Sequence, residues 1–375
     1  MLRMIRSFLP VGQGAFYCES FSQKNTHDNI NIVYDCGSQT DVKIVELEIR
    51  NNFRYGETID ALFISHLHED HVNGIPYLLA HCNVKRIYFP LITSKNRKLM
   101  EIYYYVNNID GFSFNFFRDP YETVRNLSPD NTPVLNGIDE ADNEDESIDW
   151  QQDRLRRQRS GDNVFEDIKA PYHLKNTAYD KWLYIPFNFR QTARVQSLLN
   201  NLQGQFQRTI TEDEMVRLWE NNNPGDRDKI KQAYAKVPGG FNVNSMTLFS
   251  GEIGDTLSQY KRGCCSIPYF PGCKSPGCLY MGDYDASGTM KWKDLQKAYQ
   301  RYWQHIGGVQ IPHHGSHHNF NPDFLRMDAF FIISAGYTNR YHHPHASVVK
   351  AFLLKGIMPH IVTEQAGSAA HFVIF

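Results

Sequence analysis

Residues 61–74 read Ala-Leu-Phe-Ile-Ser-His-Leu-His-Glu-Asp-His-Val-Asn-Gly, and the rest of the chain is interpreted around this stretch. Its apolar start predicts a short buried strand. The side chains that follow, His66, His68, Asp70 and His71, are all of types that bind metals. At the end of an extended strand His66 and His68 point to the same side, so they can bind one metal. The chain then turns, which lets Asp70 and His71 reach a second metal beside the first.

Imidazole and carboxylate ligands of this kind suit zinc best, and manganese or iron less tightly. Two such metals, about 3.5–4 Å apart, can activate a water and stabilise both oxygens of a displacement. A solvated histidine-rich loop is the alternative interpretation. The coincidence of a strand, several ligand types and a glycine turn favours the metal site. We therefore predict two divalent metal ions, with zinc as the first choice and manganese as the second.

The overall composition limits the class of protein. The chain has 375 residues, 41% of them hydrophobic, and a formal net charge of −2. This length allows one large domain or two, and the near balance of charge gives no overall basic signal for nucleic acid. No apolar run approaches a membrane span, and the start of the chain is too short an apolar run for a signal peptide. Seven cysteines, an odd number, predict reduced thiols and a cytoplasmic location.

A later strand supplies a candidate bridge between the two metals. Residues 279–283 read Leu-Tyr-Met-Gly-Asp, which predicts a strand that ends at Asp283. Both oxygens of a carboxylate can serve divalent metals. Asp285 is the alternative, but Gly282 permits close backbone approach beside Asp283.

A second dense group of histidines follows a predicted strand at 309–312. His313 and His314 stand at the end of that strand. One of them can bind a metal, and the other can hydrogen-bond a leaving group or a substrate oxygen. Farther along the chain, His343 and His345 lie in a loop before a predicted helix, where they are placed to enter the same cleft.

Residues 107–240 depart from the pattern of the segments around them. An acidic run at 139–147 and a basic run at 154–159 predict an exposed, partly flexible insertion. Such a basic run is more often a solvated helix face than a nucleic-acid contact. We expect the insertion to cover one side of the metal cleft and to shape substrate choice. The flanking segments, 1–106 and 241–375, are then the two halves of one domain.

The region before Asp283 is rich in cysteine. Its four thiols lie within fifteen residues, at Cys264, Cys265, Cys273 and Cys278. Four thiolates can form a structural zinc site, but adjacent cysteines and a four-residue gap differ from the usual paired spacing. Free loop thiols are therefore the favoured interpretation, and structural zinc is the alternative.

The pattern His-x-His-x-Asp-His at 66–71 resembles the signature of the metallo-β-lactamase superfamily. Several further motifs resemble one branch of that superfamily, the competence-type DNA-uptake proteins and the phosphorylcholine esterases. These motifs are Val11-Gly-Gln-Gly, Asp35-Cys-Gly, Asn244-Ser, Met281-Gly-Asp, Pro312-His-His-Gly-Ser and Tyr341-His-His-Pro-His. The resemblance covers residues 4–90 and 240–375. It implies an α+β fold, a four-layer αββα sandwich with the metals at one edge of two packed sheets.

The resemblance also implies a role for each motif residue. The implied metal ligands are His66, His68, Asp70, His71, Asp283 and His314. The residues that would line the substrate pocket are His313, Ser316, His343 and His345. Asp35 would sit under the site and orient the histidine loop. Asn244 stands where many members of the superfamily have a further histidine, which would leave the first metal weakly held or completed by water.

Together these features predict hydrolysis of a phosphoester, above all a phosphodiester in nucleic acid or a nucleotide. Asp70 would bind metal and hold the attacking hydroxide, and His313 or a loop histidine would protonate the leaving oxygen. A lactonase, a thioesterase or a phosphorylcholine esterase is the alternative, because one fold hosts many chemistries. A binding module without activity is disfavoured, since the ligand set is complete.

Overall fold

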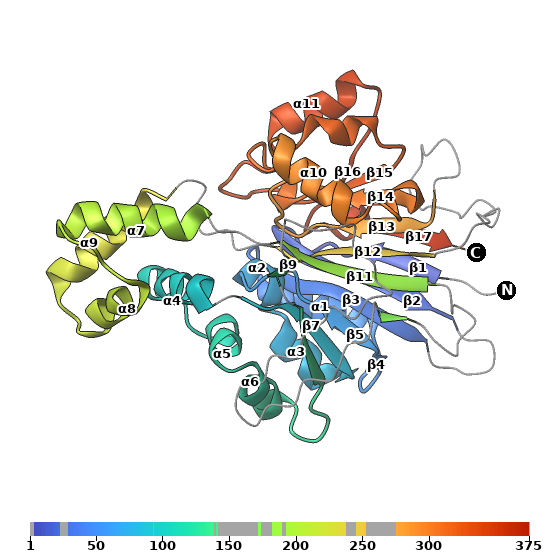
Figure 1. Cartoon of the computed structure of the whole chain (residues 1–375). Helices are drawn as coiled ribbons and strands as arrows, with labels where there is room; N and C mark the ends of the chain where they lie inside the picture. The colour runs from blue at the N-terminus through green and yellow to red at the C-terminus, as the bar shows by residue number, and fades with distance from the viewer. Residues whose placement is uncertain are drawn as a thin grey trace.

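The computed structural model describes most of the chain. The described residues are 4–22, 29–92, 94–138, 140–141, 172–173, 182–189, 193–237, 245–252 and 275–374. Two large sheets pack face to face within them, and helices cover the outer face of each sheet (Figure 1). None of the helices in these ranges is both long enough and apolar enough to cross a membrane.

The first sheet contains seven strands in the order β17-β1-β2-β3-β5-β7-β8. Their bounds are β1 Met4–Phe8, β2 Gly14–Phe21, β3 Ile30–Ser38, β5 Ala61–Phe63, β7 Arg86–Pro90, β8 Val134–Ile138 and β17 Ala370–Ile374. The pairs from β17 to β3 are antiparallel, and the pairs from β3 to β8 are parallel. Parallel strands end at the same edge of a sheet, so the loops that leave β3 and β5 lie close together.

The second sheet follows the order β10-β11-β12-β13-β14-β15-β16, with β9 beside β11. The bounds are β9 Glu140–Ala141, β10 Tyr172–His173, β11 Trp182–Phe189, β12 Thr247–Glu252, β13 Gly277–Tyr280, β14 Ile306–Gln310, β15 Phe330–Ser334 and β16 His360–Val362. Strands β13 to β16 are parallel, which brings the loops after β13 and β14 to one edge. Two short strands, β4 (Thr58–Ile59) and β6 (Asn83–Val84), form a separate pair.

Helices complete the four layers. Their bounds are α1 Val42–Asn52, α2 Glu69–Val72, α3 Ile75–His81, α4 Ser94–Asn107, α5 Phe112–Arg118, α6 Pro120–Leu127, α7 Ala193–Phe206, α8 Glu212–Glu220, α9 Pro224–Ala235, α10 Thr289–Ala298 and α11 Ala346–Leu354. The 3-10 helices are η1 Trp303–His305, η2 His313–Gly315, η3 Pro322–Arg326 and η4 Ala366–Ser368. Helices α10 and α11 lie above the sheets in Figure 1, and α1 and α3 pack on the outer face of the first sheet.

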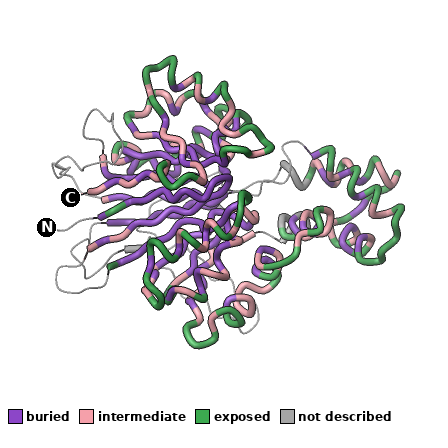
Figure 2. Tube along the Cα trace, turned by 180° about the vertical axis from the view of Figure 1, so that it is seen from behind, coloured by how far each residue is buried: buried purple, intermediate pink, exposed green. Residues whose placement is uncertain are grey.

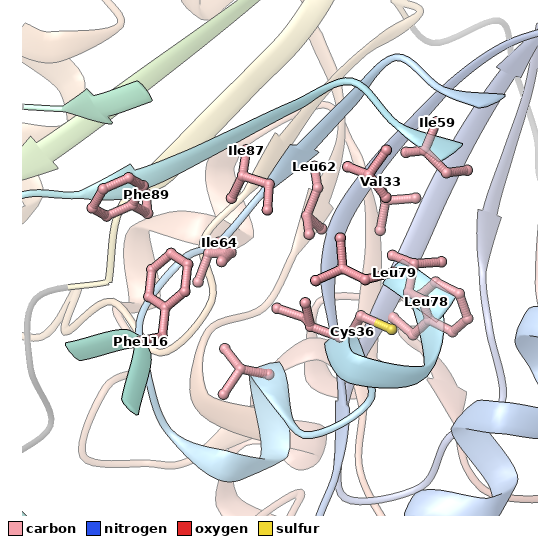
Figure 3. Close-up of a cluster of buried hydrophobic side chains, with 14 of the residues drawn as sticks. Val33, Cys36, Ile59, Leu62, Ile64, Leu78, Leu79, Ile87, Phe89 and Phe116 are labelled. Carbon is pink, nitrogen blue, oxygen red and sulfur yellow. The ribbon is translucent and has the colours of Figure 1, made fainter. Parts of the chain in front are cut away.

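Strand alternation explains why the sheets are covered on both faces. In β3, Val33 packs against the outer helices, whereas the next residue, Tyr34, packs between the sheets. Leu62 and Phe63 in β5 divide in the same way, as expected for side chains that alternate along a strand. Figure 3 shows part of the outer cluster, where strand residues such as Leu62 meet Leu78 of α3. The predicted αββα fold is confirmed.

The segment 107–240 divides between the sandwich and an added helical unit. Strand β8 pairs with β7 in the first sheet, and β11 pairs with β12 in the second. The segment is therefore not wholly outside the sandwich, in contrast to the expectation from its charge runs. The charge runs themselves lie outside the described residues, apart from residues 140–141 in β9.

The helices α7, α8 and α9 pack on α4, away from the sheets, and together these four form the helical arm (Figure 1). Helix α8 begins after Thr211, whose hydroxyl accepts a hydrogen bond from the backbone N–H of Glu214 at 3.2 Å. Met215 and Trp219, four residues apart on one helix face, then point into the buried centre of the arm. Figure 2 shows this buried centre as a separate region beside the buried strands of the sandwich. That the arm covers the cleft stays a prediction.

Candidate metal centre

The candidate ligands come from four loops or turns at one edge of the sandwich. These are the loop after β5, the short helix α2, the turn after β13 and the 3-10 helix η2 after β14. Among the described residues, two groups have ligand atoms within 4.8 Å of one another, namely His66, His68 and Asp283, and Asp70, His71 and His314. The structure therefore brings together all six residues that the resemblance implies as metal ligands.

Asp283 lies between the two groups. Its Oδ2 is 3.6 Å from Nε2 of His66, in the first group. Its Oδ1 is 3.2 Å from Nε2 of His71 and 3.9 Å from Nε2 of His314, in the second. Each oxygen of one carboxylate thus faces a different group, which is the arrangement that a bridging ligand requires.

Several ligand atoms are buried and make no hydrogen bond of ordinary geometry to the described residues. Among the described residues, the buried atoms without a hydrogen-bond partner include Nε2 of His66, His68 and His71 and Oδ1 of Asp283. A buried polar atom left unpaired is costly, so such groups normally have partners in folded proteins. These atoms converge on the same small volume, and nitrogen and oxygen donors of this kind suit a divalent metal. The residues present therefore fit a metal pair.

The electrostatics of the site favour a cation. Burial lowers the pKa of His66 and His68, so both rings stay neutral and keep a lone pair for a metal. Burial opposes charge on His71 as well, but three nearby carboxylates, first that of Asp283, raise its pKa well above the usual value. Burial likewise opposes charge on Asp283, yet the surrounding imidazoles hold its pKa well below the usual value. The site thus concentrates negative charge in a buried place.

Asp35 holds the histidine loop from below. It is fully buried and adopts a left-handed backbone conformation, with φ of 56°, within β3. Its Oδ1 accepts a hydrogen bond from the backbone N–H of Ser65 at 2.7 Å. Its Oδ2 accepts one from the Ser65 hydroxyl at 2.7 Å and lies 2.8 Å from Nδ1 of His71. A proton on Nδ1 of His71 leaves Nε2 free for a metal, so this geometry supports the predicted orienting role.

Replacing Asp35 with asparagine is expected to weaken metal binding about 10- to 100-fold, the usual effect of losing a partner of a metal-binding histidine. An amide nitrogen cannot accept the Nδ1 proton of His71, so the ring would turn its protonated nitrogen toward the metal. Competition with a chromophoric chelator measures the affinity. Asp41→Asn, at the exposed start of α1, is the matched control. An affinity for Asp35→Asn equal to that of the control would contradict the role.

Two serines lie beneath His66, and no role was predicted for either from the sequence, although Ser245 belongs to the Asn244-Ser motif. The hydroxyls of Ser65 and Ser245 lie 2.9 and 3.1 Å from Nδ1 of His66. The Ser245 hydroxyl also accepts a hydrogen bond from the backbone N–H of Asp283 at 2.8 Å, so it links two candidate ligands. Asn244, which the resemblance pointed to, lies outside the described residues.

The turn that carries Asp283 is fixed by a buried glutamine, which the sequence did not reveal either. Gln310 Oε1 accepts hydrogen bonds from the backbone N–H groups of Met281 and Gly282, at 2.7 and 2.8 Å. Gly282 has φ of 52°, and a Cβ there would lie 2.7 Å from the Ser65 side chain. The expected close backbone approach at this glycine is therefore present.

The alternative bridging residue points elsewhere. Asp285 accepts a hydrogen bond from the backbone N–H of Ser287 at 3.0 Å and pairs with the ammonium group of Lys291. It belongs to neither group of candidate ligands within the described chain. Asp283 is thus the carboxylate that the fold brings to the site.

His313 lies at the mouth of the site. Its side chain is 23% exposed, and its Nε2 is 3.7 Å from Oδ2 of Asp283. Its Nδ1 lies 2.9 Å from Oδ1 of Asn319, which orients the ring. The ring of His343 lies beside it, with centroids 5.5 Å apart, and burial, followed by the charges of neighbouring histidines, lowers the pKa of His343 to about 3. His343 is therefore a neutral hydrogen-bonding group at neutral pH.

The two other predicted pocket residues have different settings. His345 lies next in line, with its ring centroid 5.0 Å from that of His343, and its Nδ1 accepts a hydrogen bond from the backbone N–H of His317 at 3.2 Å. Ser316 is only 3% exposed, and its hydroxyl accepts a hydrogen bond from the backbone N–H of His318 at 3.3 Å. His345 thus continues the line of histidines along the mouth, whereas Ser316 lies beneath the loop.

Of the four cysteines that the sequence groups together, the structure describes one. Cys278 is a free thiol in β13, buried among the side chains that pack between the two sheets. The other members, Cys264, Cys265 and Cys273, lie outside the described residues. Of the two interpretations, a loop thiol does not describe Cys278, because strand β13 places it in the core.

The fold is the αββα sandwich, and its two ligand groups have donor sets that suit divalent metals. Residues 25–152 match the sequence model of the family described as the metallo-beta-lactamase superfamily. The chain carries a domain of this superfamily, and the prediction made from the motif at 66–71 is confirmed. The narrower resemblance to competence-type proteins and phosphorylcholine esterases stays a prediction.

Individual relatives match over limited lengths. Ribonuclease J of Mycoplasma pneumoniae is 31% identical over 121 residues, which is 28% of this chain and 21% of that protein. Ribonuclease J of Mycoplasma genitalium is 33% identical over 82 residues, 19% of this chain and 14% of that protein. The chain therefore matches about a fifth of the length of these relatives, or less. The crystal structure of unliganded yeast PDE1 aligns over 100% of both chains, with a TM-score of 0.45 and 11% identity.

Proposed function

We propose that this protein is a metal-dependent phosphodiesterase or nuclease. The observation that carries the proposal is the position of Asp283, whose two oxygens face two separate groups of ligand atoms, several of them buried without partners. A pair of divalent metals held there would supply an activated water and positive charge for phosphoryl oxygens. The six ligands would be His66, His68, Asp70, His71, Asp283 and His314.

The remaining groups have roles that follow from their positions. Asp70 Oδ2 lies 3.2 Å from Nε2 of His314, and as an acceptor it can orient the proton of an attacking water. His313, held at Nδ1 by Asn319, has Nε2 directed toward Asp283 and can donate a proton to the leaving oxygen. His343 can hydrogen-bond a phosphoryl oxygen from the same side.

Two observations favour a phosphoester over an acyl substrate. The mouth of the site carries imidazoles beyond the six ligands, and these provide donors for the several oxygens of a phosphate group. The two curated relatives that match the chain are both named Ribonuclease J, although the match covers only part of each. An RNA, a single-stranded DNA or a nucleotide is accordingly the substrate class that we propose, with zinc or manganese as the metal.

The test combines metal analysis with a panel of substrates. We expect about two divalent metals per chain and hydrolysis of bis-p-nitrophenyl phosphate, RNA or single-stranded DNA in preference to a lactone, an acyl thioester or a phosphorylcholine ester. Chelation and His68→Ala should each abolish hydrolysis, and zinc or manganese should restore it after chelation. His305→Ala, in η1 outside the candidate site, is the matched control. Full activity in chelator would overturn the proposal, and activity confined to an acyl substrate would favour the alternative hydrolases.

A further inference from the structure

Helix α4 connects the helical arm to the metal site. Ile102 points into the buried centre of the arm. Tyr104 points the other way, into the cluster between the first sheet and its helices. Tyr103 lies between these two directions and contacts both clusters while remaining half-buried. Figure 1 shows α4 between the other three helices of the arm and α2, the helix that carries two candidate ligands.

The ring of Tyr103 lies against a metal ligand. Its centroid is 5.3 Å from that of His68, and the two planes differ by 30°. The Tyr103 hydroxyl makes no hydrogen bond to any residue that the structure describes. Because Tyr103 is only half-buried, its hydroxyl does not require a protein partner. The ring is the part of this side chain that contacts the candidate site.

The same helix fixes this ring relative to the loop. The hydroxyl of Tyr104 donates a hydrogen bond to the carbonyl of Leu67 at 3.4 Å, and the hydroxyl of Ser113 in α5 donates to the same carbonyl. Leu67 immediately precedes His68, so α4 and α5 hold the backbone of the ligand while Tyr103 covers its ring. The position of Tyr103 beside the candidate metal site is thus set by helices and not by a loop.

We propose that Tyr103 is the wall of a nucleobase subsite, where the base next to the scissile phosphoester stacks on the tyrosine ring. This inference rests on the proposed phosphodiesterase function and adds to it a binding site for one base of the nucleotide or single-stranded nucleic acid. Stacking on an aromatic side chain is a common way to hold a base without reading its identity, because every base has a π-face. The subsite therefore distinguishes substrates with a base from those without one.

The first test measures binding without hydrolysis. Adenosine 5′-monophosphate and ribose 5-phosphate carry the same phosphate, and only the first has a base. We expect calorimetry on the zinc-loaded protein to show about 5- to 150-fold tighter binding of the nucleotide, the range for one stacked base. Tyr103→Leu should remove this preference, whereas Tyr103→Phe should keep it. Tyr55→Leu, a change at a tyrosine 83% exposed on another surface, should leave it unchanged.

The second test uses hydrolysis. Thymidine 5′-p-nitrophenyl phosphate and methyl p-nitrophenyl phosphate share a leaving group and differ in the nucleoside. Tyr103→Leu should lower kcat/KM for the first relative to the second by a similar factor, mainly through KM, with metal content preserved. Equal losses for both substrates, or an unchanged preference in binding, would overturn the subsite. A base preference in binding with no hydrolysis of either ester would overturn the phosphodiesterase function and leave the subsite standing.

Discussion

Replacing Asp283 with alanine is expected to reduce bound metal from about two ions per chain to less than one, and kcat/KM for a phosphodiester by at least about 10³-fold. Asp283 is the one ligand that faces both groups, with Oδ2 near His66 and Oδ1 near His71. Its removal therefore weakens both metal positions at once. Metal content by mass spectrometry and steady-state hydrolysis of bis-p-nitrophenyl phosphate measure the two effects.

The chain offers a matched control for this change. Asp285→Ala removes a carboxylate only two residues away, but one that pairs with Lys291 and belongs to neither ligand group among the described residues. It should keep both metals and most of the activity. If Asp285→Ala lost the metals while Asp283→Ala kept them, the bridging assignment would be wrong.

The clustering of the candidate ligands could be predicted because local geometry brings most of them together. His66, His68, Asp70 and His71 lie within one turn after a strand, where the alternation of side chains already separates them into pairs. The positions of Asp283 and His314 could be predicted for a related reason, since each follows an apolar run that predicts a strand. Within each sheet the carboxyl ends of the parallel strands share an edge. The packing of the two sheets then brings the residues that follow β5 in one sheet together with those that follow β13 and β14 in the other.

The residues that support these ligands could not be predicted in the same way. Ser245 contacts His66 across 179 positions of sequence, and a single serine carries no spacing signal. The role of Gln310 could not be predicted either, because it depends on a hydrogen bond from the backbone of Met281, which follows a neighbouring strand. Ser65 differs from these two residues, because it immediately precedes the histidine motif and its position beside His66 follows from the sequence.

The division of the segment 107–240 was missed for a different physical reason. Strand β8 contains Asn136 and Gly137, which weaken its apolar pattern, and its place in the sheet depends on pairing with β7. Charge runs nearby then made the whole segment resemble an insertion. The position of Tyr103 could not be predicted either. Nothing in the sequence of α4 indicates which of its three consecutive tyrosines packs on the candidate ligand His68.

Replacing Glu19 with leucine is expected to lower the free energy of unfolding by about 3–5 kcal/mol, the cost of leaving a buried charge without its partner. Glu19 lies between the two sheets and is 2% exposed. Its Oε1 accepts hydrogen bonds from Nε of Arg6 at 2.6 Å and the Tyr280 hydroxyl at 2.8 Å. Its Oε2 accepts from the hydroxyls of Tyr184 at 2.5 Å and Ser250 at 2.7 Å. One carboxylate therefore links strands of both sheets.

Arg6 makes this loss severe, because it is only 4% exposed and an arginine cannot give up its charge in a protein. Its other hydrogen-bond partner among the described residues is the carbonyl of Pro276 at 2.7 Å, which does not neutralise a cation. Urea unfolding in excess chelator measures the effect without a contribution from bound metal. The double variant Arg6→Met with Glu19→Leu should recover much of the stability, since it removes both charges together. A single variant as stable as the wild type would show that water reaches Arg6 between the sheets.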